Sequence, residues 1–134
     1  MRFTKTEAYS HRANLNRLGE QDLGDKFNVI RVLRNYFGLN GLTGEILMID
    51  SESCRMPDIL IKGRPVMVIE LDGGVHGMGD QISKRSKDVD RDKDYEIIGV
   101  KLVIINKEIT NGYETKKVIK VLEENGLKRN AKTI

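Results

Sequence analysis

The chain has 134 residues, of which 39% are hydrophobic and 32% are charged. This length fits one compact domain, and the composition supports a packed core and excludes wholesale disorder. The formal net charge is only +3, from 23 basic and 20 acidic side chains. A nucleic-acid surface would therefore have to arise from a local excess of basic residues.

The sequence shows no signal for secretion or for membrane insertion. The segment from Arg2 to Arg12 is polar, unlike a signal peptide, and no apolar run approaches the roughly 20 residues of a membrane-spanning helix. The single cysteine, Cys54, cannot form an internal disulfide, which suits a reducing compartment. We therefore expect a cytoplasmic protein without a membrane partner, and its small size would also fit a protein of phage or mobile-element origin.

Four segments have the pattern of helices, and glycines mark where three of them end. The predicted helices cover residues 6–18, 25–37, 81–98 and 113–124. We expect the second to stop near Gly38, the third at Gly99 and the last before Gly126, because glycine readily adopts the conformation that ends a helix.

Four shorter segments have the pattern of strands. The predicted strands cover residues 45–49, 58–61, 66–72 and 101–105. Only the turn-like segment 62–65 separates the second from the third, so these two are expected to form a hairpin. The third is apolar on both faces, which is typical of a central strand covered by helices on both sides.

From residue 25 onward the order of these elements, α-β-β-β-α-β-α, predicts an α/β domain with a central mixed sheet flanked by helices. We interpret the whole chain, 1–134, as one domain. Within it, 1–44 supplies the N-terminal helices, 45–105 the sheet and catalytic core, and 106–134 the C-terminal helix and a basic tail.

Acidic residues gather where the predicted central strand ends. Because strand side chains alternate, Glu70 and Asp72 share one face, and Asp58 on the neighbouring strand can approach Glu70 across the hairpin. Converging carboxylates are costly unless a cation neutralises them, and Mg²⁺ or Mn²⁺ prefers such oxygen ligands. The pattern predicts a metal site of Asp58, Glu70 and Asp72 that hydrolyses a phosphodiester. The alternative is that all three are ordinary turn and strand-end residues.

Polar residues that follow these acids suggest further contacts. His76, in a glycine-rich loop, is either a general acid or base beside a phosphate or a solvated loop residue. Arg91, on the next helix, is placed to contact phosphate or to brace an acid. Lys84, Arg85 and Lys87, one turn earlier, are either contacts to the DNA backbone or part of an exposed face of mixed charge.

Taken in order, these residues resemble a known family. The set is Pro57-Asp58, Glu70-Leu71-Asp72-Gly73, His76 and Asp88-x-x-Arg91-Asp92-x-x-Tyr95-x-x-x-Gly99. It is similar to the pattern of the very-short-patch-repair-like (Vsr-like) branch of the PD-(D/E)xK nucleases and spans residues 57 to 105. The resemblance implies a restriction-endonuclease-like fold and Mg²⁺-dependent chemistry, with Asp58 as principal metal ligand and Glu70 as second.

The chain departs from this pattern in two ways. Asp72 stands where the superfamily usually has a lysine, which leaves its role open as a metal ligand, a base or a structural acid. Many members also carry an acid on the first helix, and Glu20 and Asp25 are the candidates here.

We therefore expect a Mg²⁺- or Mn²⁺-dependent endodeoxyribonuclease, nicking or structure-selective, that acts on duplex or branched DNA in repair or recombination. One alternative is a Holliday-junction-type resolvase, which would have to be a homodimer to make paired cuts. Another is a non-catalytic nucleic-acid-binding module of the same fold. A nuclease of the same kind that acts on RNA is a further alternative.

Overall fold

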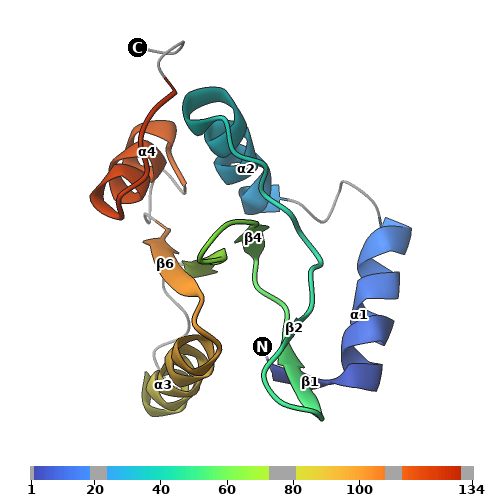
Figure 1. Ribbon diagram of the computed structural model, residues 1–134. Coiled ribbons are helices and arrows are strands. Elements are labelled where there is room, and N and C mark those ends of the chain that lie inside the picture. Colours follow the sequence, from blue (N-terminus) through green and yellow to red (C-terminus); the bar gives the residue numbers. More distant parts are fainter. Residues whose placement is uncertain (1, 19–23, 73–80, 108–112, 131–134) are drawn as a thin grey trace.

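Four helices and two three-stranded sheets make up the part of the chain that the structure describes (Figure 1). This computed structural model describes residues 2–18, 24–72, 81–107 and 113–130, without the side chains of 13–18, 24, 25 and 81–87. The elements are β1 (Arg2–Thr4), α1 (Lys5–Leu18), α2 (Gly24–Phe37), β2 (Leu47–Met48), β3 (Ser53–Arg55), β4 (Ile59–Ile61), β5 (Met67–Asp72), α3 (Gln81–Ile98), β6 (Lys101–Asn106) and α4 (Thr115–Glu124).

The larger part of the core is built on the sheet with strand order β4-β5-β6. β5 is the central strand: it pairs antiparallel with β4, with Ile59 opposite Ile69, and parallel with β6, with Ile69 opposite Val103. The predicted hairpin and the predicted central strand are thus confirmed, and α3 lies in the crossover between the two parallel strands, as such a connection requires.

Both faces of this sheet are covered by helices. On one face, side chains of all three strands pack against α2 and α4 in one buried cluster, whose members include Leu33, Ile69 and Leu122. On the other face, Leu60 and Val68 pack against Tyr95 of α3. Figure 1 shows this layering, with α2 and α4 above the sheet and α3 below it. Side chains of β5 therefore alternate between two buried clusters, one on each face of the sheet. This is why the strand has apolar residues on both faces.

A second sheet, with strand order β1-β3-β2, was not predicted from the sequence. Its three strands are antiparallel and only two or three residues long. The predicted strand 45–49 corresponds only to β2, and the chain then turns where the Asp50 carboxylate accepts hydrogen bonds from the backbone N–H groups of Glu52 and Ser53. Strands this short and polar have too few alternating apolar residues to give a recognisable pattern.

The helix ends agree with the glycine signals. Gly99 follows α3 directly, and Gly126 is the second residue after α4. Their φ angles are 74° and 93°, a left-handed conformation that costs other residues energy. Among the described residues, no helix has the length and apolar character needed to cross a membrane.

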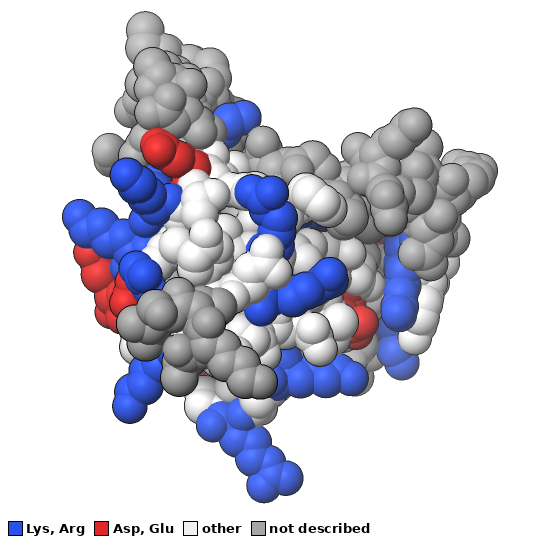
Figure 2. Space-filling view, turned by 90° about the horizontal axis from the view of Figure 1, so that it is seen from above, with Lys and Arg blue, Asp and Glu red and all other residues white. Residues whose placement is uncertain are grey.

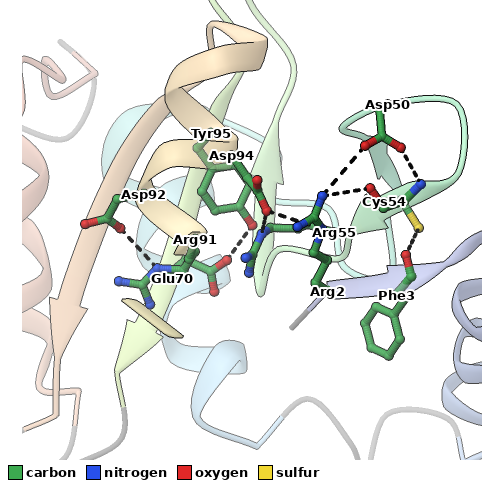
Figure 3. Close-up of polar contacts among 11 residues, drawn as sticks. Arg2, Phe3, Asp50, Cys54, Arg55, Glu70, Arg91, Asp92, Asp94 and Tyr95 are labelled. Carbon is green, nitrogen blue, oxygen red and sulfur yellow. Dashed lines mark hydrogen bonds and ion pairs between the residues drawn. The ribbon is translucent and has the colours of Figure 1, made fainter. Parts of the chain in front are cut away.

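A buried ion pair joins the second sheet to α3. The Nε of Arg55 in β3 lies 2.6 Å from Oδ2 of Asp94 in α3, and the two residues are only 5% and 7% exposed. Arg2 of β1 adds a longer contact, with its Nε 3.8 Å from the same oxygen (Figure 3). Because a buried charge is costly without its partner, this pair ties the small sheet to α3.

We predict that Arg55→Met destabilises the protein by about 3–5 kcal/mol, because it leaves Asp94 as a buried charge without its closest partner. The measurement is the free energy of unfolding in urea. The double variant Arg55→Met/Asp94→Leu should recover most of the loss, since it removes both charges. Arg129→Ala, which breaks an exposed pair with Glu123, is the control and should cost less than about 1 kcal/mol. An equal cost for both single variants would contradict the assigned role of the buried pair.

Candidate active site

The end of β5 carries two of the predicted acids on the face that meets α3. Glu70 accepts a hydrogen bond from Tyr95, and Asp72 pairs with Arg91, both of which belong to α3. The two carboxylates share this face because side chains two residues apart in a strand point the same way.

Asp58 lies beside Glu70, as the hairpin predicts. The antiparallel register places Ile59 opposite Ile69, and its continuation by one residue sets Asp58 opposite Glu70. Oδ2 of Asp58 accepts a hydrogen bond of 2.8 Å from the backbone N–H of Leu71, which fixes this carboxylate across the two strands. We call Asp58 and Glu70 the acid pair.

Glu70 holds its carboxyl group in an unfavourable place for a negative charge. The residue is 7% exposed, and its Oε1 accepts a 2.6 Å hydrogen bond from the hydroxyl of Tyr95, which is 1% exposed. Burial first, and then the neighbouring Asp58 carboxylate, raise the pKa of Glu70 to about 7, although the hydrogen bond from Tyr95 acts in the opposite direction. Since this pKa is close to neutral pH, a cation beside the acid pair would favour the ionised form of Glu70.

Tyr95 remains a neutral donor to this carboxylate. Its burial, and after that the negative charge of Glu70, raise its pKa above the ordinary value for tyrosine. Figure 3 shows Tyr95 reaching from α3 toward Glu70, with Arg91 on the same helix beside them. The hydroxyl therefore fixes the orientation of Glu70 without supplying charge.

Asp72 is held by an arginine. Its Oδ1 lies 3.0 Å from Nη1 of Arg91, which also lies 3.7 Å from Oδ1 of Asp88, while Nε of Arg91 is 3.3 Å from Oδ1 of Asp92. Burial lowers the pKa of Arg91, but Asp72 and then Glu70 and Asp88 outweigh it, so the pKa is raised and the guanidinium stays charged. Of the two roles predicted for Arg91, the structure shows the brace for an acid, and its contact with phosphate stays a prediction.

The predicted group of three carboxylates is thus reduced to two close neighbours. Within the described residues, no group of three or more His, Cys, Asp or Glu side chains suited to a metal ion is present. The carboxylate of Asp72 is engaged by the ion pair with Arg91 on the α3 side. Metal binding by Asp58, Glu70 and Asp72 stays a prediction.

Lys26 is a site residue that the sequence analysis missed. Its Nζ lies 3.8 Å from Oδ1 of Asp58, and the two side chains are 26% and 32% exposed. Lys26 sits in the first turn of α2, far from Asp58 in sequence, and the packing of α2 on β4 brings the two together. No local pattern could reveal this contact.

The remaining predicted residues are not placed by the structure. His76 and Glu20 lie outside the described residues, and the side chains of Asp25, Lys84, Arg85 and Lys87 are not described. Their catalytic, accessory or DNA-binding roles stay predictions.

No family model, curated protein or solved structure matches this chain. The resemblance to the PD-(D/E)xK nucleases therefore rests on the motif residues themselves, and function has to be argued from the geometry of the acid pair.

We predict that Glu70→Gln raises the stability of the protein above neutral pH. The pKa of Glu70 is about 7 in the folded chain and 4.5 in the unfolded chain, so the folded chain keeps this proton up to a higher pH. Its contribution to the free energy of unfolding is therefore full below about pH 4.5 and is lost as pH rises toward 7. At about pH 8 the variant should be more stable than the native chain by on the order of 3 kcal/mol, and at about pH 4.5 by little.

The measurement is urea unfolding at both pH values, with Glu96→Gln, an exposed position on α3, as the matched control. Glutamine can still accept the hydrogen bond from Tyr95, so the comparison isolates the charge. A stability difference that does not change between the two pH values would show that the acid pair carries no electrostatic strain.

Proposed function

We propose that this chain is a Mg²⁺- or Mn²⁺-dependent endodeoxyribonuclease with a restriction-endonuclease-like fold. The observation that carries the proposal is the acid pair: Asp58, directly before β4, and Glu70, in β5, lie side by side at the end of the sheet. Burial and the Asp58 carboxylate raise the pKa of Glu70 to about 7, and a buried acid whose pKa is perturbed in this way is a recurrent feature of functional sites. The ordered resemblance from Asp58 to Gly99 supports the same reading.

The donor chemistry of the acid pair fits a hard divalent cation. Mg²⁺ is commonly bound through one or two carboxylates, with water and substrate phosphate in its other positions. Asp58 and Glu70 supply two carboxylates, and loss of the Glu70 proton adds the charge that such an ion would balance. When bound there, the ion would polarise the phosphodiester and favour an ionised water at neutral pH.

The chain's own residues prepare this arrangement. The N–H of Leu71 holds one oxygen of Asp58 and Tyr95 holds one oxygen of Glu70, so both carboxylates are oriented before substrate arrives. Lys26, beside Asp58, brings an ammonium group that can pair with a phosphate oxygen or with the attacking water. Arg91 keeps Asp72 neutralised next to the pair.

We predict that Asp58→Asn reduces Mg²⁺-dependent cleavage of DNA by more than about a hundredfold, because loss of a ligand should exceed the 10- to 100-fold cost typical of its supporting partners. The measurement is cleavage of a panel of linear, nicked, mismatched and four-way-junction DNA. Asp90→Asn, an exposed aspartate on α3, is the control and should cleave like the native chain. Cleavage that survives in Asp58→Asn would refute the assignment. A preference for the junction, together with a dimeric mass in solution, would favour the resolvase alternative.

We predict that Mn²⁺ binding strengthens as pH rises from about 6 to about 8, because Glu70, with a pKa of about 7, must lose its proton to become a ligand. Calorimetric titrations in two buffers of different ionisation enthalpy would measure the proton released. Glu70→Gln should bind Mn²⁺ weakly and without this pH dependence. Binding that is equally strong at both pH values would show that Glu70 is not a ligand.

A non-catalytic nucleic-acid-binding module is the second candidate. The observation that favours it is the ion pair between Asp72 and Arg91, which engages one of the three predicted metal ligands. The same titrations separate the two candidates, since the module predicts no uptake of Mn²⁺ with or without DNA.

A further inference from the structure

Charge is distributed unevenly between the two sides of the central sheet. Residues 26–37 and 113–130, which contain the described side chains of α2 and those of α4, carry three and five Lys and Arg residues against three Glu. Residues 81–98, which form α3 on the other side, carry five Asp and Glu and five Lys and Arg, so their charges balance. The small net charge of the chain therefore conceals a basic side formed by α2 and α4.

The basic side forms one surface. α2 and α4 pack together in the same core cluster, and Asn28 of α2 donates a 2.7 Å hydrogen bond to the carbonyl of Tyr113, just before α4. The segment after α4 returns to α2, where the N–H of Asn130 donates to the carbonyl of Tyr36. We call this surface the basic face; its exposed members are Arg31, Arg34, Lys116, Lys120, Lys128 and Arg129.

Figure 2 views the molecule from above Figure 1, the side on which α2 and α4 lie. Lys and Arg side chains spread across the described part of this view, with few Asp or Glu between them. Such a surface attracts polyanions, because unbalanced positive charges reinforce one another over several ångströms.

We propose that the basic face binds the phosphate backbone of the nucleic acid whose cleavage is proposed above. This inference rests on the proposed function for the identity of the polyanion. Lys26, in the first turn of α2, lies beside Asp58, and the hydroxyl of Tyr113, two residues before α4, donates to the backbone carbonyl of Asp72. α2 therefore starts beside the acid pair and α4 starts near the end of β5, so a phosphate backbone that follows α2 to its first turn would reach the end of the sheet at which the acid pair lies.

The dimensions also agree. α2 has 14 residues, which corresponds to a length of about 21 Å. A duplex laid along it would present about six base-pair steps at roughly 3.4 Å each. The basic face can therefore contact several successive phosphates, which position a duplex without reading its sequence.

The same surface suits a membrane or a protein partner less well. A helix that lies in a lipid surface needs an apolar stripe on its exposed face. Among the described residues, the large exposed hydrophobics are Tyr9, Phe27, Met48, Val89 and Ile97, of which only Phe27 lies on α2 or α4. Protein interfaces, in turn, are depleted in lysine and rich in aromatic residues at their centre.

The test is the affinity for a short fluorescent DNA duplex in EDTA, where cleavage cannot occur. Arg34→Gln/Lys120→Gln removes two exposed charges from the basic face, and Lys5→Gln/Lys93→Gln removes two exposed charges from α1 and α3 as a matched control. We expect the first variant to bind more weakly and to lower the slope of log affinity against log salt by about 2, one unit for each lost phosphate contact. The control should bind like the native chain.

The possible outcomes test the basic face and the nuclease separately. Equal weakening in both variants, or in neither, overturns the basic face as the binding surface. Tighter binding of the native chain to phosphatidylserine vesicles or to polyglutamate than to DNA overturns nucleic acid as the partner. Binding that Arg34→Gln/Lys120→Gln weakens, in a native chain that cuts no DNA with Mg²⁺, supports the basic face and rejects the nuclease. Cleavage by the native chain, together with unchanged binding by Arg34→Gln/Lys120→Gln, supports the nuclease and rejects the basic face.

Discussion

The repulsion between two neighbouring carboxyl groups, one of them buried, is the constraint on which this structure depends. Glu70 lies in the interior beside Asp58, with the hydroxyl of Tyr95 as its direct hydrogen-bond donor. Apolar packing of β5 does not require an acid at this position. The protein tolerates it because a network of neutral donors orients both carboxylates, and a destabilising arrangement that persists in a core is characteristic of a functional site.

The helix that supplies the hydrogen-bond donor of Glu70, α3, also buries other polar side chains. Asp94 and Tyr95 lie three and four residues after Arg91 and therefore share with it the face that meets the sheets. All three are buried, and they bind Asp72, Arg55 and Glu70 respectively. Among the side chains of α3 that the structure describes, the buried ones are these polar groups, so the position of the helix depends on specific partners in both sheets. A change at one end of this row, such as loss of the pair with Arg55, would therefore be transmitted through α3 to the acid pair.

The parts of the fold that could be predicted are those in which a local pattern repeats. Apolar residues on both faces identified β5 as central, and the hairpin then brought Asp58 to Glu70. The short strands of the second sheet, the pair between Arg55 and Asp94, and the approach of Lys26 could not be predicted, because each depends on residues distant in sequence meeting in the folded chain. Asp72 illustrates the limit: its shared face with Glu70 was deducible, but its ion pair with Arg91 was one of two alternatives that sequence alone left open.

α2 connects the acid pair with the basic face. Its first turn places the ammonium group of Lys26 against the acid pair, and its later turns carry Arg31 and Arg34 across the basic face. An acidic site repels the phosphates it would have to cut, since like charges disfavour approach at short range. A basic helix that begins beside that site would offset this repulsion and would guide the phosphates of the proposed substrate toward it. The low net charge of the chain is therefore compatible with the proposed binding of nucleic acid, because exposed basic side chains of α2, α4 and the segment after α4 gather on one surface.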